Sequence, residues 1–296
     1  MAARFSSHSL PLGARWSETR SWALTAPMGH LAIWVGCYAA SMVAMGGLLL
    51  HGSMPGWAIV IAMLTAIGTY LIDRVRPLAG QMDPADVMAH PDRASLMMSN
   101  PCAIRILTAT FLVAAMSLSV VFVPMSCIVV AGAPVGVLLY GHRRRGRRLK
   151  DRLFIKNAIV ALSMVAMVVL LVGPGDEPML LMLVSLCLLL HVFADAMLCD
   201  IDDRDADQQF GTRTIPNVWG VRITWAIALM MNLVSAALLL IAAAMELLPL
   251  TTAVVLGLLP LSATMILQSF GSARIKDLVD MKLPIAVLAG WLLLLV

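Results

Sequence analysis

The chain has 296 residues, of which 60% are hydrophobic and only 13% are charged, with a net charge of +4. A soluble globular domain carries about 25% charged residues. This difference and the mean hydropathy of +0.90 exclude a soluble enzyme, a disordered chain and a fibrous repeat. The five cysteines are isolated, which argues against a disulfide framework or a thiolate metal site. The composition therefore predicts an all-α polytopic membrane protein.

Apolar stretches long enough to cross a bilayer recur from residue 30 to the C-terminus. A spanning helix needs about 20 mostly apolar residues and ends at Gly, Pro or charged clusters. These rules predict about nine spans in a single bundle, at 30–50, 57–73, 103–122, 125–141, 154–172, 179–199, 222–245, 251–270 and 283–296.

The connectors between these spans alternate between two kinds. One kind is short and has no Lys or Arg, as in 51–56 and 173–178. All 21 Lys and Arg residues lie on the other side, in residues 1–29, in the longer loops or at span ends. Because basic loops stay in the cytoplasm, we expect an integral protein of a bacterial inner membrane, with a cytoplasmic arm (1–29), cytoplasmic Asp-rich loops and the C-terminus outside. Short basic loops suit anionic lipid headgroups or an anionic substrate, not nucleic acid.

An acidic cluster follows the sixth predicted span. Six of the 17 acidic residues fall within 195–207, opposed only by Arg204. On a continuous helix, at about 100° per residue, Asp200, Asp203 and Asp207 share one face. Hard oxygen ligands at the membrane edge suit Mg²⁺, which takes one or two carboxylates and also binds substrate phosphates. The alternative is a solvated acidic loop that caps the next helix.

The segment after this cluster carries a family motif. Its pattern resembles the second Asp-rich motif of the UbiA superfamily of intramembrane prenyltransferases, which reads Asp-x-x-x-Asp followed by Gly, Lys or Arg, Thr and a closing Gly. The matching residues are Asp203, Asp207, Gly211, Arg213, Thr214 and Gly220. A second similarity to this family lies in Arg148-Leu149-Lys150 and in the helix of small residues that begins near Asn157. These two segments resemble the family's Leu-Lys-Arg connector and the helix after it. The resemblance covers about residues 30–296 and implies one UbiA-type bundle of nine helices.

The first motif of this family differs in the chain. The usual form is Asn-x-x-x-Asp-x-x-x-Asp at the end of the second helix, whereas alignment on Asp73 gives Thr69, Asp73 and Pro77. Asp83 and Asp86 lie in the following loop and offer substitute ligands. The run Asp83-Pro84-Ala85-Asp86 also has the form of a helix start, with an Asp N-cap followed by Pro.

The resemblance implies an activity and a site. The activity is Mg²⁺-dependent transfer of a prenyl group from a polyprenyl diphosphate to an aromatic or other lipophilic acceptor. The implied Mg²⁺ ligands are Asp200, Asp203, Asp207 and Asp73, and the last three of these are the expected catalytic residues. Lys150 and Arg213 are expected on the diphosphate, with Asn157 and Thr69 as further substrate-binding residues.

One ionisable pair lies inside the apolar part of the sixth predicted span. His191 and Asp195 are one helical turn apart, and ionisable residues within the membrane are functional candidates by default. We list His191 as a substrate-binding candidate. The pair can contact the acceptor, help to hold the metal, or form a His–Asp hydrogen bond between helices.

Two other functions compete with the transferase. The degenerate first motif favours a non-catalytic UbiA-like membrane protein that binds an isoprenoid or lipid. The acidic face also fits a cation transporter, but transporter sites usually lie near the membrane midplane and these carboxylates cluster at one edge.

Overall fold

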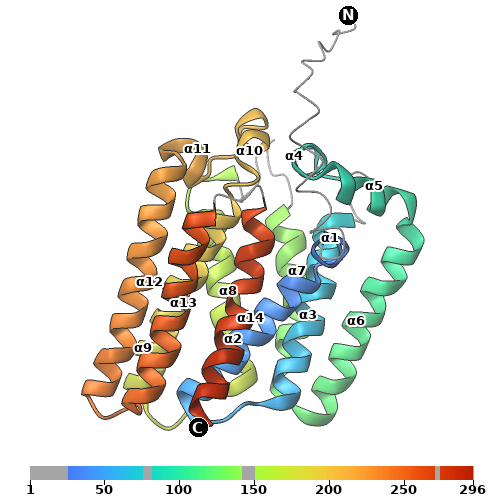
Figure 1. Ribbon diagram of the computed structural model, residues 1–296. Helices are drawn as coiled ribbons and strands as arrows, with labels where there is room; N and C mark the ends of the chain where they lie inside the picture. Colours follow the sequence, from blue (N-terminus) through green and yellow to red (C-terminus); the bar gives the residue numbers. More distant parts are fainter. Residues whose placement is uncertain (1–25, 76–81, 142–150, 271–273, 296) are drawn as a thin grey trace, which may run out of the picture.

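The computed structural model describes residues 26–75, 82–141, 151–270 and 274–295, and every regular element in these ranges is a helix (Figure 1). The helices are α1 (Ala26–His30), α2 (Ile33–His51), α3 (Gly56–Val75), α4 (Pro84–Ala89), α5 (Pro91–Ser99), α6 (Pro101–Phe122), the 3-10 helix η1 (Pro124–Ser126), α7 (Cys127–Gly141), α8 (Ile155–Val172), α9 (Pro178–Cys199), α10 (Arg204–Gln209), α11 (Ile215–Trp219), α12 (Val221–Ala244), α13 (Leu250–Phe270) and α14 (Ile275–Leu294). The predicted all-α fold is confirmed.

Seven helices are long and apolar enough to cross a membrane: α2, α3, α6, α8, α9, α12 and α13. The other two predicted spans correspond to α7, which is shorter, and α14, which carries four charged residues in its first half. The count of nine spans therefore stays a prediction. Helix bounds agree with the sequence analysis within three residues, except that α14 begins at Ile275 and not at 283. Its early charged residues were read as a loop, but they find partners inside the bundle.

The short helices gather at one end of the bundle. Figure 1 shows α4, α5, α10 and α11 together at the upper end, while the connectors from α2 to α3 and from α8 to α9 lie at the opposite end. The Asp-rich segment and the helices α4 and α5, which follow α3 in the chain, are therefore on the same side, as predicted. The cytoplasmic orientation of this end stays a prediction.

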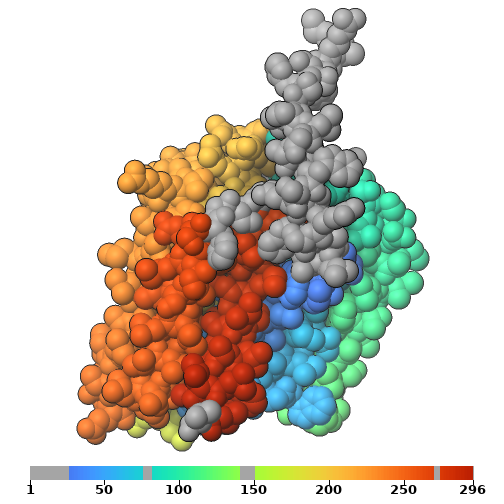
Figure 2. Space-filling model, in the orientation of Figure 1, coloured from blue at the N-terminus to red at the C-terminus, as the bar shows by residue number. Residues whose placement is uncertain are grey.

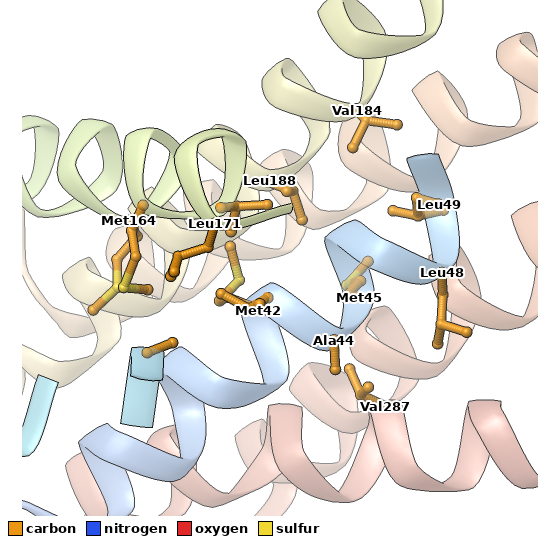
Figure 3. Close-up of a cluster of buried hydrophobic side chains, with 14 of the residues drawn as sticks. Met42, Ala44, Met45, Leu48, Leu49, Met164, Leu171, Val184, Leu188 and Val287 are labelled. Carbon is orange, nitrogen blue, oxygen red and sulfur yellow. The ribbon is translucent and has the colours of Figure 1, made fainter. Parts of the chain in front are cut away.

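The core is built around α2, whose buried face contacts α3, α8, α9 and α14. Figure 3 shows Met42 and Met45 of α2 between Leu171 of α8, Leu188 of α9 and Val287 of α14. Small residues permit this close packing, since a Cβ at Gly46 would meet the Val168 side chain. Dense packing of α2 fixes the helices that carry the polar residues described below.

The outer surface is apolar. In Figure 2, the side chains of α12, α13 and α14, coloured orange to red, adjoin one another and form one side face of the bundle. Large apolar side chains such as Met230, Leu258 and Ile285 are exposed on these helices. Exposed apolar surface of this extent is typical of a membrane interaction face.

Two local structures at the Asp-rich end bear on the site. Asp83 is the N-cap of α4, accepts a hydrogen bond from the Ala85 N–H at 3.3 Å and is followed by Pro84, so the predicted helix start is confirmed. The expected continuous helix through the acidic cluster is wrong, because α9 ends at Cys199 and α10 begins at Arg204. A helix cannot readily continue through a run of carboxylates at its C-terminal dipole.

Candidate functional site

A cavity of about 460 Å³ opens within the bundle toward the Asp-rich end. Its charged end is lined by Asp73, Asp86, Lys156, Asp200, Asp203, Lys276 and Asp280. Its apolar wall comes from α7 and α8 and includes Ile128, Val129, Val137, Met167 and Leu170. One space therefore joins a cluster of carboxylates and ammonium groups to a long apolar surface.

Lys156, near the start of α8, connects two of the aspartates. Its ammonium lies 2.6 Å from Asp200 Oδ1 and 3.7 Å from Asp207 Oδ2. The neighbouring Asn157 donates from Nδ2 to Asp200 Oδ2 at 3.0 Å. The Asp200 carboxylate is buried and held by both residues, so α8 fixes the end of α9 at this point.

Asp203 is held from two other directions. Its Oδ2 lies 3.2 Å from the Lys276 ammonium, and its Oδ1 lies 2.7 Å from His90 Nε2. Burial by itself raises the pKa of a carboxyl, but Lys276 and His90 outweigh it and hold the pKa of Asp203 well below its usual range. Because an ionised carboxylate only accepts, the Nε2 hydrogen of His90 is the donor. Burial lowers the pKa of His90, which favours the neutral form of its ring.

A smaller pocket of about 50 Å³ lies beside the charged end. Its lining includes Asp83, Asp86, Lys156, Asp203 and Asp207. Asp86 also forms an ion pair with the buried Arg93 of α5. The loop helices α4 and α5 thus bring an acidic and a basic group to the same end as the second acidic cluster.

The predicted site residues other than His191 fall into three groups. The cavity is lined by Thr69, Asp73, Asn157, Asp200 and Asp203, and Asp207 lines the smaller pocket. Arg213 is exposed and is absent from the described lining of both pockets. Lys150 and Pro77 lie outside the described residues.

His191 belongs to a deeper polar network. Its Nδ1 lies 2.5 Å from Asn232 Oδ1, which can only accept, so Nδ1 carries the hydrogen. Its Nε2 lies 3.3 Å from Asp195 Oδ2. Asp195 is ion-paired with the buried Lys282, whose ammonium also donates to Thr264 Oγ1 at 2.6 Å. The hydrogen bond that joins His191 to another helix therefore goes to Asn232 of α12 and not to Asp195. His191 is absent from the described lining of the cavity, and its role in substrate binding stays a prediction.

Comparison with known proteins identifies the fold and the family. The sequence matches the family model of the UbiA prenyltransferase family over residues 85–280. The chain belongs to this family. No curated protein matches its sequence significantly. The family and the seven apolar helices make it an integral membrane protein.

Solved structures of the UbiA fold resemble the chain over nearly its whole length. A UbiA homolog from Archaeoglobus fulgidus bound to GPP and Mg²⁺ has a TM-score of 0.61 at 13% identity, covering 93% of this chain and 99% of that one. The same homolog bound to DMAPP and Mg²⁺ has a TM-score of 0.57 at 11% identity, with coverage of 92% and 99%. A structure of digeranylgeranylglyceryl phosphate synthase has a TM-score of 0.53 at 15% identity, with coverage of 91% and 97%.

The chemistry of this UbiA-family cavity suits Mg²⁺. Within the described ranges, no three His, Cys, Asp or Glu side chains are close enough to form a metal site by themselves. Mg²⁺ usually takes only one or two carboxylates and completes its shell with water and substrate phosphates. Several carboxylates at one end of an open cavity fit an ion whose other ligands are water and the oxygens of a bound diphosphate.

Sequence reasoning missed two cations of this site, Lys156 and Lys276. Lys156 directly precedes Asn157, so the small-residue helix that resembles the family pattern contained the signal. Lys276 lies in the first turn of α14. The one signal in the sequence that could have placed it at the site is the excess of negative charge in the acidic cluster, which a charged helix start elsewhere in the chain could balance. The sequence analysis assigned Mg²⁺, and not these lysines, to the acidic cluster.

Proposed function

We propose that this chain transfers a prenyl group from a polyprenyl diphosphate to a lipophilic acceptor within the membrane, with Mg²⁺ at its Asp-rich end. The observation that carries the proposal is the single cavity that joins carboxylates and lysines to an apolar wall. A polyprenyl diphosphate matches this cavity, because its anionic headgroup suits the charged end and its apolar tail suits the apolar wall.

The charged end supplies groups for both the metal and the headgroup. Asp73, Asp200 and Asp203 line the cavity, and Asp207 lies beside it, so these carboxylates would hold Mg²⁺. When bound, Mg²⁺ supplies positive charge that stabilises the departing diphosphate. Lys156 and Lys276 line the same end and would donate hydrogen bonds to the diphosphate oxygens.

The apolar wall supports the second half of the reaction. Side chains of α7 and α8 contact the prenyl tail and keep water away from the allylic cation that forms when the carbon–oxygen bond breaks. The acceptor then captures this cation in place of water and releases a proton, so that the products are the prenylated acceptor, diphosphate and one proton. The A. fulgidus homolog bound to GPP or DMAPP together with Mg²⁺ supports this class of donor.

A non-catalytic lipid-binding protein is the second candidate, and one observation favours it. Three carboxylates of the charged end already have protein cations as partners: Asp86 has Arg93, Asp200 has Lys156, and Asp203 has Lys276. Such pairs can hold the Asp-rich end together without a metal ion.

A transfer assay separates the two candidates. The full chain in vesicles that contain a bacterial lipid extract is incubated with labelled geranylgeranyl diphosphate and Mg²⁺, and the lipids are then separated. A labelled lipid product that disappears with EDTA and in the Asp203→Asn variant supports the transferase. If no product forms although a diphosphate analogue still binds, the non-catalytic protein is favoured.

A further inference from the structure

An exposed pair of aromatic rings lies at the Asp-rich end of the bundle, outside the cavity. Phe154 and Trp219 are 41% and 42% exposed, and their rings meet edge to face with the centroids 5.5 Å apart. Phe154 directly precedes α8 and Trp219 lies two residues before α12, so each ring lies where a helix long and apolar enough to cross the membrane begins. Aromatic residues at the ends of spanning helices typically lie at the level of the lipid headgroups. The pair therefore marks one boundary of the bilayer.

The two loop segments that carry these rings are attached to each other. The backbone N–H of Arg213 donates to the carbonyl oxygen of Asp151 at 3.1 Å, and the Thr212 hydroxyl donates to Asp151 Oδ1 at 3.1 Å. Phe154 has a φ of 66°, which a bulky residue rarely adopts because it is strained. Hydrogen bonds between the loops thus fix the surface on which the exposed rings lie.

Three exposed arginines belong to the same two segments. Arg152 lies two residues before Phe154, Arg222 lies three residues after Trp219, and Arg213 is in the attached loop. Within the described ranges, none of the three guanidinium groups has a hydrogen-bond or ion-pair partner. None of these five residues belongs to the described lining of either pocket. We call Arg152, Phe154, Arg213, Trp219 and Arg222 the aromatic–arginine patch.

A second aromatic pair at the opposite end of the bundle provides a comparison. Trp57 and Phe122 are stacked with their centroids 4.1 Å apart, and both are exposed. Trp57 lies at the start of α3 and Phe122 is the last residue of α6. The adjoining connectors, 52–55 and 123–126, contain no Lys or Arg. Both pairs are thus placed to meet a bilayer boundary, but of the two only Phe154 and Trp219 have arginines close by in the chain.

We propose that the aromatic–arginine patch binds the headgroup of an anionic phospholipid of the surrounding membrane. The guanidinium groups donate hydrogen bonds to the phosphate oxygens, for which their planar geometry is suited. The two rings contact the apolar part of the lipid next to its headgroup. Ile223, exposed on α12 beside Arg222, continues the apolar surface toward the acyl chains. Because the patch is separate from the cavity lining, this inference goes beyond the proposed function and does not depend on it.

The test uses the two aromatic pairs as local reporters of lipid binding. Phosphatidylglycerol and phosphatidylcholine with identical brominated acyl chains are titrated separately into the full chain in detergent, because bromine quenches the fluorescence of a tryptophan that it contacts. The emission of Trp219 is the difference between the native chain and Trp219→Phe, and that of Trp57 is obtained in the same way. We expect half-quenching of Trp219 at about a tenfold lower mole fraction of phosphatidylglycerol than of phosphatidylcholine, since each arginine near an anionic headgroup contributes about fivefold before screening by salt. Trp57 should distinguish the two lipids by less than about twofold.

Arginine variants locate the preference. We expect Arg152→Gln combined with Arg222→Gln to reduce the preference of Trp219 for phosphatidylglycerol to about twofold or less. Arg105→Gln is the matched control, because Arg105 is also exposed and lies near the start of α6, on the opposite side of the bundle from α12 (Figure 1). It should leave the preference of Trp219 unchanged. All three side chains are exposed, so these variants should fold, which circular dichroism checks.

Several results would overturn the proposal. One is equal quenching of Trp219 by the two lipids in the native chain. Another is the same preference at Trp57 as at Trp219, or the same loss in Arg105→Gln as in the double variant, because a general surface charge and not a site would then explain the binding. Inorganic phosphate that abolishes the preference, where chloride of equal ionic strength does not, would indicate a site for free anions in place of a lipid site.

Discussion

The Lys276 ammonium lies 3.2 Å from Asp203 Oδ2, although 73 residues separate the two along the chain. The backbone N–H of Lys276 also donates to Asp202 Oδ2 at 2.8 Å. The first turn of α14 is thereby attached to the acidic turn between α9 and α10. Since Asp203 and Lys276 both line the cavity, this pair contributes one negative and one positive charge to its wall.

Removing the charge of Lys276 should have opposite effects on a cation and an anion. In Lys276→Gln, Asp203 loses its cationic partner, so we expect Mg²⁺ alone to bind more tightly and a diphosphate analogue more weakly, each by about threefold to tenfold. Isothermal titration of each ligand separately measures both changes. A change of the same sign for both ligands would show that Lys276 acts only on the fold.

Lys156 should matter more for the diphosphate than Arg213, the basic residue of the family motif. Lys156 lines both pockets, whereas Arg213 is exposed. We expect Lys156→Gln to weaken binding of a diphosphate analogue about tenfold, as loss of a charged hydrogen bond implies. Arg213→Gln should weaken it by less than about twofold, the effect of a screened surface charge. A larger loss in Arg213→Gln than in Lys156→Gln is the contrary result.

The buried Asp195–Lys282 pair should dominate the stability of the bundle. In Lys282→Met, Asp195 stays buried without its cation, and we expect a loss of about 3–5 kcal/mol in the free energy of unfolding. Adding Asp195→Asn removes the uncompensated charge and should restore much of that loss. Reversible unfolding in SDS and detergent mixtures measures both values. If the double variant is no more stable than Lys282→Met, the pair is not the cause.

Two glycines at neighbouring helix ends give a packing test. A Cβ at Gly47 would lie 2.7 Å from the carbonyl oxygen of Ser53, a backbone atom that cannot rotate away. We expect Gly47→Ala to lower the free energy of unfolding by about 1–3 kcal/mol. Gly56→Ala is the control, since nothing lies within 4 Å of its Cβ position. Equal effects of the two substitutions would contradict this packing at the turn after α2.

The long helices could be predicted from the sequence because their signal is local. Runs of apolar residues bounded by Gly, Pro and charges place their ends within a few residues. The start of α14 could not be placed in this way, because its first half is charged and its lysines contact Asp195, Asp202 and Asp203. Those partners are far away in the chain.

The parts of the site that have a local sequence signal were predicted, and the parts that depend on contacts between distant residues were not. The acidic cluster and the family motif pointed to Asp200 and Asp203, which line the cavity. The argument from one helical face was wrong in its geometry, since the chain turns between α9 and α10. Lys156 carried no motif of its own, and its role depends on the packing of α8 against α9.

The most direct test of the Mg²⁺–diphosphate site is ligand-dependent stability. The full chain in detergent is unfolded with Mg²⁺, with a geranylgeranyl diphosphate analogue that cannot ionise, and with both together. At about 100 times its dissociation constant, a bound ligand adds about 2.7 kcal/mol.

The variants decide what a positive result means. Asp203→Asn combined with Asp207→Asn removes two carboxylates of the charged end, and Asp205→Asn is the matched control, because its side chain is 86% exposed. The account predicts that Mg²⁺ and the analogue together stabilise the native chain and Asp205→Asn by more than the sum of their separate effects, and that the double variant shows no such additional gain. A folded native chain that shows no response would contradict it.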